Sequence, residues 1–99
     1  MEYEGGFLTP NLASLALGSL TLSPTFDKDT VTYSTNSTNA TNTLSYTTES
    51  ASATVATKLN DVTFTGSTVT WSSNTDTLKV IVTDGTLSKT YTITCTHTT

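Results

Sequence analysis

The last third of the chain alternates apolar and polar side chains around an Asp-Gly pair, and this pattern restricts the possible folds most. An apolar residue stands at every second position on both sides of Asp84-Gly85: Leu78, Val80 and Val82, then Tyr91, Ile93 and Cys95. A period of two puts such residues on one face of a β-strand. Asp-Gly favours a type I′ turn, which needs a positive φ at both central residues. The pattern therefore predicts a long hairpin with one apolar face, which a second layer must cover.

Shorter alternating segments fill the rest of the chain. We expect further strands at residues 12–22, 30–34, 43–48, 53–59, 62–64 and 68–71, the first of them interrupted by a bulge at Gly18-Ser19. Turn residues separate these segments about every 8 to 12 positions, and no long stretch has helical periodicity. Seven or eight short strands in this spacing predict an all-β fold, an immunoglobulin-like antiparallel β-sandwich with Greek-key connections.

At 99 residues the chain is long enough for a single domain. We expect residues 1–11 to be a linker or N-terminal tail, because Glu2 to Gly6 is polar and glycine-bearing, and residues 12–97 to form the sandwich. The residues that we expect in its core are Leu15, Leu17, Leu22, Phe26, Tyr33, Leu44, Val55, Leu59, Val69, Trp71, Leu78, Val80, Val82, Tyr91 and Ile93.

Hydroxyl groups rather than charges make the chain polar. Ser and Thr fill 39 of the 99 positions, whereas charged residues make up only 12%. Thr is β-branched and suits the solvent face of a pleated sheet. The chain has four Lys, no Arg and a net charge of −4. It therefore lacks the clustered cations that nucleic acid or an anionic membrane surface would require, and we expect neither as a partner.

Few side chains are of a kind that carries catalysis. His97 is the single histidine, so a Ser-His-Asp arrangement has little to build on, and we expect this residue to be exposed. Cys95 is also single, which excludes an intrachain disulfide, and its place in the alternation predicts a small buried apolar residue. We predict that the protein is not an enzyme and has no catalytic residue, no cofactor and no metal.

The aspartates have a functional interpretation beside a structural one. Calcium needs several oxygen ligands, usually from closely spaced acidic residues. Here only Asp27 and Asp29 are close in sequence, so we expect turn residues, rather than metal ligands, at all five positions: Asp27, Asp29, Asp61, Asp76 and Asp84.

Three aromatic residues are candidates for a sugar-stacking platform. Trp71, Tyr33 and Tyr46 would form one if they lay on an outer face. Their alternation places them with the apolar residues instead, which favours the core.

Both ends of the predicted domain resemble bacterial cadherin-like β-sandwich domains. The opening does so through Leu12, Leu15, Leu17, Leu20, Leu22, Pro24, Phe26 and Tyr33. The close does so through Asp84-Gly85 followed by Tyr91-Thr92-Ile93-Thr94, so the resemblance spans residues 12–96. Such domains usually carry Gly-x-Asn before the penultimate strand, and Ser73-Asn74-Thr75-Asp76 lacks this glycine. The departure concerns the geometry of one turn.

The resemblance implies an accessory domain. Similar domains occur in bacterial surface and secreted proteins and on capsid and tail proteins of tailed bacteriophages. Residues 1–6 lack the basic and apolar regions of a signal peptide. Together with the Thr-rich body and the missing disulfide, this looks more like the phage version. We therefore expect display on a virion surface, with the bacterial cell surface or the extracellular space as the alternative. The expected partners are host-cell surface polysaccharides, contacted by weak carbohydrate binding, or other virion proteins. The isolated chain is expected to be a monomer or a weak dimer.

Overall fold

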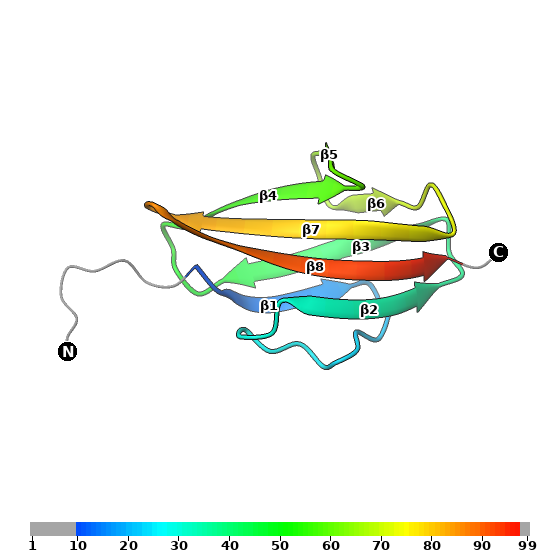
Figure 1. The fold of residues 1–99 in the computed structure, drawn as a ribbon, viewed down its shortest axis with the longest axis horizontal. Coiled ribbons are helices and arrows are strands. Elements are labelled where there is room, and N and C mark those ends of the chain that lie inside the picture. The colour runs from blue at the N-terminus through cyan, green and yellow to red at the C-terminus, as the bar shows by residue number, and fades with distance from the viewer. Residues whose placement is uncertain (1–9, 98–99) are drawn as a thin grey trace.

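The computed structural model describes residues 10–97, and this range consists of eight β-strands with no helix (Figure 1). The strands are β1 (Leu12–Leu17), β2 (Thr32–Ser37), β3 (Thr41–Thr48), β4 (Thr54–Leu59), β5 (Val62–Thr63), β6 (Thr68–Thr70), β7 (Thr75–Asp84) and β8 (Leu87–His97). Burial alternates from residue to residue through nearly the whole of β7, as its sequence predicts. The prediction of an all-β chain is confirmed.

The strands form two sheets that pack face to face. One has three strands in the order β1-β3-β6, and the other has five in the order β2-β8-β7-β4-β5. Only β4–β5 and β7–β8 are hairpins within one sheet, because every other connection crosses to the opposite sheet. With β1, β3 and β6 as strands A, B and E, and β4, β7 and β8 as C, F and G, this is the strand arrangement of an immunoglobulin-like sandwich.

One pair of strands in this largely antiparallel sandwich is parallel. Strand β2 lies beside β8 in the same direction, with Thr32 opposite Thr92 and Ser37 opposite His97. Two parallel neighbours cannot be joined by a tight turn, and here residues 38–86, which contain β3 to β7, lie between β2 and β8 in the chain. The chain leaves the three-stranded sheet after Leu17 and crosses to the edge of the other sheet before Thr32.

The strand expected over residues 12–22, broken at Gly18-Ser19, is present only in its first part. Strand β1 ends at Leu17, and Gly18 adopts a φ of +58°, which turns the chain out of the sheet. Leu20 and Leu22 then belong to the crossing segment, where they anchor a loop to the core. Only Ser23 returns to a sheet, through an isolated antiparallel bridge to Ser34.

Of the two tight turns, the one between β4 and β5 lies at Asn60-Asp61, in the predicted gap between residues 59 and 62, whereas the one after β7 is shifted by one residue. The β7–β8 hairpin is confirmed, but its two-residue loop is Gly85-Thr86, since Asp84 already pairs with Leu87. Gly85 has a φ of +65°, and a positive φ at the first central position is what a type II′ turn needs. The type I′ pattern occurs in the β4–β5 hairpin, where Asn60 and Asp61 both have positive φ values, of 52° and 68°.

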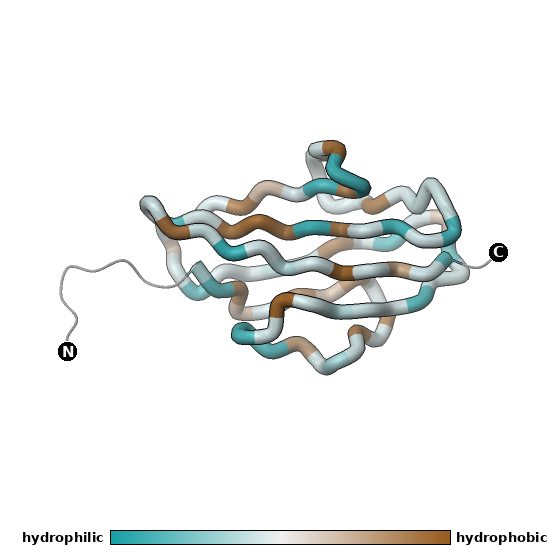
Figure 2. Tube along the Cα trace, viewed as in Figure 1, coloured by the Kyte–Doolittle hydropathy of each residue, from teal (hydrophilic) through white to brown (hydrophobic). Residues whose placement is uncertain are grey.

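Most of the predicted core is confirmed. Twelve expected residues are buried: Leu15, Leu17, Leu22, Tyr33, Leu44, Val69, Trp71, Leu78, Val80, Val82, Tyr91 and Ile93. Phe26, Val55 and Leu59 are only partly buried and pack against this cluster, whereas Leu12 and Cys95 are fully buried within it. Figure 2 shows a brown stretch along β7 and separate brown residues between pale ones along β8.

Two tyrosine hydroxyls fix the crossing segment, residues 18–31, against the sandwich. The hydroxyl of Tyr33 donates to the carbonyl oxygen of Asp27 at 2.7 Å, and that of Tyr91 donates to the carbonyl of Lys28 at 2.6 Å. The Phe26 ring lies between them, 6.0 Å from the Tyr33 ring and 6.1 Å from the Tyr91 ring. The segment therefore closes one side of the sandwich, beside β1 and β2.

Pro10 and Asn11, at the end of the predicted linker, already pack against the domain. Both are buried, and the Asn11 side chain donates to Glu49 and accepts a hydrogen bond from Lys89 at 2.7 Å. The rest of the predicted linker, residues 1–9, lies outside the described residues.

Candidate functional site

The side of the sandwich opposite the crossing segment is open. Strand β6 has only three residues and pairs only with Thr41–Thr43 of β3. Beyond that point, the second half of β3 has β1 on one side and no strand of residues 10–97 on the other. Two hollows lie along this open side, each between a strand of the small sheet and a strand of the large one.

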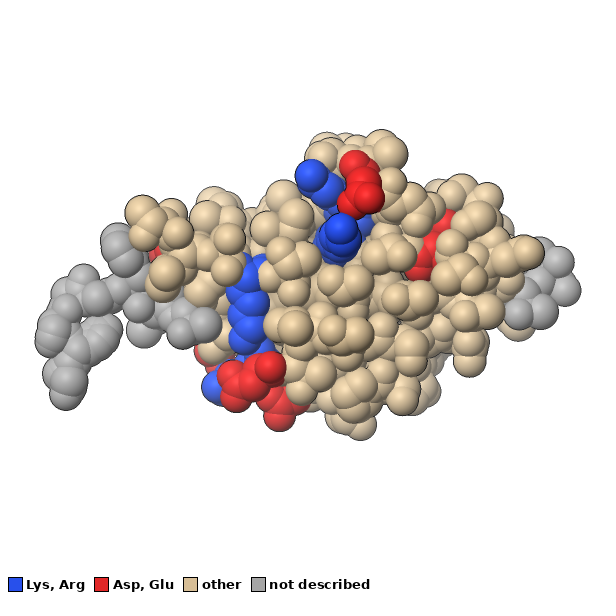
Figure 3. Space-filling model, viewed as in Figure 1, with Lys and Arg blue, Asp and Glu red and all other residues tan. Residues whose placement is uncertain are grey.

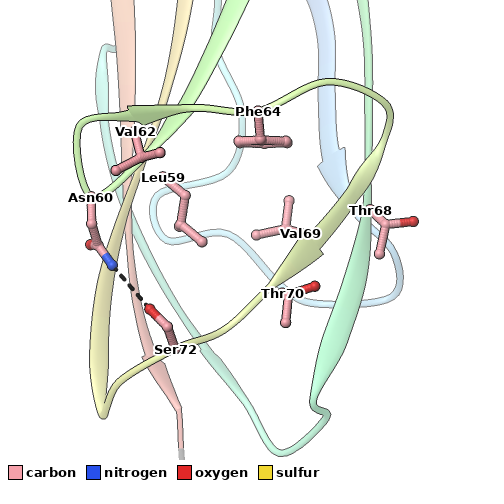
Figure 4. A pocket seen from close by; sticks show the side chains of 8 residues that line it. All are labelled: Leu59, Asn60, Val62, Phe64, Thr68, Val69, Thr70 and Ser72. Carbon is pink, nitrogen blue, oxygen red and sulfur yellow. Dashed lines mark hydrogen bonds between the residues drawn. The ribbon is translucent and has the colours of Figure 1, made fainter.

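The first hollow, here called the β5–β6 groove, is mainly apolar. It has a volume of about 320 Å³ and is lined by Leu59, Asn60, Val62, Phe64, Thr68, Val69, Thr70 and Ser72. Figure 4 shows the Asn60–Ser72 segment arching around the groove, with Leu59 and Val69 directed toward each other across it. Val62 is 67% exposed at its rim. An apolar floor with polar groups at its edge, here Asn60 and Ser72 beside Val62, is typical of a surface that contacts another molecule.

The second hollow, here called the Tyr46 hollow, is shallower and richer in hydroxyl groups. Its lining consists of Tyr46, Thr47, Thr48, Ala53 and Val55, and its volume is about 490 Å³. Tyr46 is 37% exposed, so our prediction of a core position was wrong. Its backbone position does alternate with Leu44, but β6 ends before it and leaves the ring uncovered on the open side.

The other two candidates for a sugar-stacking platform lie inside the molecule. Tyr33 and Trp71 are buried, as predicted, and the Trp71 indole nitrogen donates to the Oδ1 of Asn42 at 2.8 Å. The same oxygen accepts a hydrogen bond from Ser37 at 2.7 Å, which links the two sheets at this end. The three aromatics are therefore not brought together, and Tyr46 alone reaches the surface.

Asp76 is the most heavily hydrogen-bonded acid among the described residues, and our assignment of it to a turn was wrong. It lies in β7 and is fully buried. Its carboxylate accepts hydrogen bonds from the side chain of Asn60 at 2.7 Å and from backbone and hydroxyl groups of Ser72 and Ser73 at 3.0–3.4 Å. Burial raises the pKa of Asp76, but these hydrogen bonds outweigh it and hold the pKa below the ordinary aspartate value.

The remaining aspartates are dispersed. Asp27, Asp29 and Asp61 lie in turns, as predicted, and the Asp27 carboxylate accepts from the backbone N–H of Asp29 at 2.8 Å. Lys79 contacts Asp61 at 2.9 Å and lowers its pKa. Asp84 is instead a buried strand end that accepts from Ser52 at 2.8 Å. Within residues 10–97 no three His, Cys, Asp or Glu side chains are grouped so that they could hold a metal ion.

Cys95 and His97 end strand β8, close to Asp76. Cys95 is fully buried, as predicted, and lies opposite Asp76 in the β7–β8 ladder. Burial raises the pKa of its thiol, and the negative charge of Asp76 raises it further. His97 is half-buried rather than exposed, because it pairs with Ser37, and its Nε2 atom is buried without a hydrogen-bond partner among the described residues.

Charged groups occupy small areas of the surface. Figure 3 shows a few separate blue and red clusters on the face of the five-stranded sheet, with uncharged surface between them. Lys89 is engaged structurally, since its ammonium group donates to the Lys28 carbonyl at 2.6 Å and lies 5.3 Å from the centre of the Tyr91 ring. No helix within residues 10–97 is of a length and apolarity that would cross a membrane.

Neither the family models nor the curated proteins yield a match to this chain. The class of the protein therefore follows from its strands and their order. It is an immunoglobulin-like β-sandwich with one closed and one open side.

Proposed function

We propose that this chain is a non-enzymatic accessory domain that makes weak contacts with host-cell surface polysaccharides from the surface of a bacteriophage virion. The phage setting rests on the resemblance to cadherin-like domains. The observation that carries the proposed contact is the Tyr46 hollow. The half-exposed ring of Tyr46 offers a stacking face, and Thr47 and Thr48 beside it carry hydroxyl groups. These hydroxyls already bond to Ser14 and to the Ser50 carbonyl, but their oxygens can accept a further hydrogen bond, and a sugar ring uses a stacking face together with such groups.

Weak rather than tight binding fits the shape of this hollow. It is shallow and carries one aromatic ring, so a ligand would bury little area on it. Accessory domains gain strength from many copies, since each additional attached copy raises the effective concentration. A domain repeated over a particle surface would therefore bind a polymer firmly although each copy binds it weakly.

The experiment is binding of the 99-residue chain to a glycan array and to purified peptidoglycan and lipopolysaccharide. Tyr46→Ala is expected to reduce binding about tenfold, as loss of one aromatic contact does, whereas Tyr46→Phe keeps the ring and retains most of it. Leu87→Ala is the matched control, because Leu87 is similarly exposed at the β7–β8 hairpin. Equal binding by the wild-type and Tyr46→Ala chains, or no binding to any of these polymers, would contradict the proposal.

The alternative is a spacer or adhesion module of a bacterial cell-surface or secreted protein, and one observation favours it. The molecule measures 51 × 25 × 16 Å, and β1 begins toward one end of its long axis while β8 ends at the other (Figure 1). Many domains have their termini close together. A chain that enters at one end and leaves at the other adds length to the protein that contains it. Neighbouring capsid and tail genes would favour the virion, and a signal peptide with a wall anchor would favour the spacer.

A further inference from the structure

The four edge strands of the sandwich are protected unequally. On the closed side, Ser23 exchanges two hydrogen bonds with Ser34 of β2, at 2.8 and 2.9 Å. Beside β1, Leu20, Leu22 and Phe26 of the crossing segment line a common hollow with Leu15. On the open side, β5 is flanked by the Lys79–Asp61 ion pair. Strand β6 has no such cover among residues 10–97.

The register of β6 shows which of its backbone groups are free. Val69 lies opposite Asn42, and the flanking hydrogen bonds join Leu44 to Ser67 at 2.7 Å and Trp71 to Ala40 at 3.1 Å. Residues 67, 69 and 71 therefore direct their N–H and C=O groups toward β3. Those of Thr68 and Thr70 point the opposite way, along the rim of the β5–β6 groove, and no other part of the described chain bonds to them.

This edge also lacks the charges that usually keep edge strands apart. From Val62 to Thr75 the sequence contains no Asp, Glu, Lys or Arg. Natural edge strands are commonly guarded by Lys, Pro or bulges. Because the whole chain carries a net charge of −4, two copies repel each other over much of their surface but meet no like charge within this segment.

We infer that β6 is a self-association edge, which joins a second copy of this chain by antiparallel β6–β6 pairing across a twofold axis. With Val69 on the axis, Thr68 of each copy lies opposite Thr70 of the other. Both residues then form hydrogen-bonded pairs, which satisfy the free N–H and C=O groups of Thr68 and Thr70 in both copies. The two small sheets become one continuous sheet, and the second copy covers the outer rim of the β5–β6 groove near Val62. This pairing is independent of the proposed sugar contact, since Tyr46 takes no part in it.

The pairing should be weak, because β6 is short and the added contact area is small. A dissociation constant of about 0.1–1 mM is expected, so the dimer should appear by sedimentation velocity and light scattering only toward the upper end of a concentration series from about 10 µM to about 1 mM. A chain that remains monomeric throughout this series would refute the inference.

Charge substitutions test the register, because Thr68 and Thr70 are both exposed on the outer face of β6. The double variant Thr68→Lys/Thr70→Lys places like charges of the two copies opposite each other and should abolish the dimer. The double variant Thr68→Glu/Thr70→Glu should do the same. An equal mixture of these two double variants should dimerise again. Thr68→Lys with Thr70→Glu is self-complementary in the inferred pairing and should dimerise at least as well as the wild type.

The matched control is Thr41→Lys with Thr43→Lys. These two threonines are exposed directly beside Thr70 and Thr68, one strand further from the edge, and should leave the dimer largely intact. The fluorescence of Trp71 and the circular dichroism spectrum establish that each variant is folded. If the Thr68→Lys/Thr70→Lys chain dimerises as the wild type does, or if the Thr68→Lys/Thr70→Glu chain does not dimerise, the inferred edge or its register is wrong.

Discussion

Replacement of Asp76 by asparagine should destabilise the protein strongly, although the two side chains have nearly the same shape. The carboxylate joins the β4–β5 hairpin, through Asn60, to the connection that precedes β7, through Ser72 and Ser73. Asn60 in turn accepts from the backbone N–H of Thr77 at 2.9 Å. Asparagine keeps one acceptor oxygen. It places an NH2 group where the carboxylate accepts from the backbone N–H groups of Ser72 and Ser73, so donors face donors.

The size of the effect follows from the bonds that are lost. A hydrogen bond to a charged group contributes about 1.5–3 kcal/mol. Ser72 and Ser73 are exposed, so water can satisfy their freed N–H groups and no cost of a buried, unpaired donor is added. The two affected contacts are long, at 3.2 and 3.4 Å, so the lower end of this range applies to each. We expect Asp76→Asn to lower the free energy of unfolding by about 3 kcal/mol at pH 7, a large part of the roughly 5–15 kcal/mol of a small domain.

The difference in the free energy of unfolding between wild type and Asp76→Asn should shrink in acid. The pKa of Asp76 is lowered in the folded protein, so at a pH between the folded and unfolded values the unfolded chain binds more protons than the folded one. The stabilisation is therefore complete above the ordinary aspartate pKa and is lost as the pH falls through the lowered value. Asparagine does not titrate, so Asp76→Asn lacks this pH dependence. The other titratable groups are the same in both proteins, and their contributions cancel in the difference between the two free energies.

Urea unfolding followed by the fluorescence of Trp71 measures both effects. This single tryptophan is 6% exposed and precedes Ser72, so its emission should change when the network is lost. Melts at pH 7 and at about pH 3 give the free energies of wild type and Asp76→Asn. A difference below about 0.5 kcal/mol at pH 7, or one that stays constant or grows toward pH 3, would refute this account of the Asp76 network.

Two further predictions concern buried groups in β8. Tyr91→Phe should lower the free energy of unfolding by about 1–2 kcal/mol, because the hydroxyl donates to the Lys28 carbonyl and accepts from the backbone N–H of Leu12. Tyr46→Phe, at a half-exposed position, should change this free energy little. Equal effects of the two substitutions in urea melts would refute the reasoning. Cys95 should react with iodoacetamide at pH 8 at least about a hundredfold more slowly in the folded protein than in guanidinium, since burial and Asp76 both disfavour its thiolate. Labelling of the native chain at the unfolded rate would show that this thiol is accessible.

The sequence was most informative where one local pattern decides the structure. The alternation around Gly85 predicted the β7–β8 hairpin, because a slip of one residue would expose the whole apolar face. The position of the turn was wrong by one residue, since glycine fits a positive φ at the first central position as well as at the second. Leu20 and Leu22 were wrongly assigned to a strand for a related reason. A loop that must be held against a core also needs spaced apolar anchors, and spacing alone does not separate it from a strand.

The candidate sites were less predictable because they depend on residues far apart in the chain. Asp76 stands in a run of Ser, Asn and Thr that looks like a turn, and its partner Asn60 lies 16 positions earlier. Tyr46 follows the alternation of its strand correctly. Its exposure depends on where β6 ends, which is a property of residues 68–70 and not of the residues around position 46.

The short length of β6 has two consequences that can be tested separately. Since it covers only the first part of β3, the Tyr46 side chain is left at the surface. Since no strand within residues 10–97 continues the sheet beyond it, the backbone groups of Thr68 and Thr70 have no partner in this part of the chain. The first consequence offers a side chain to a sugar and the second offers a main chain to another strand, so different substitutions remove them. A Tyr46→Ala chain should still dimerise, and a Thr68→Lys/Thr70→Lys chain should still bind glycans as a monomer. If both substitutions removed both properties, a single surface would be responsible, and the division of the open side into two sites would be wrong.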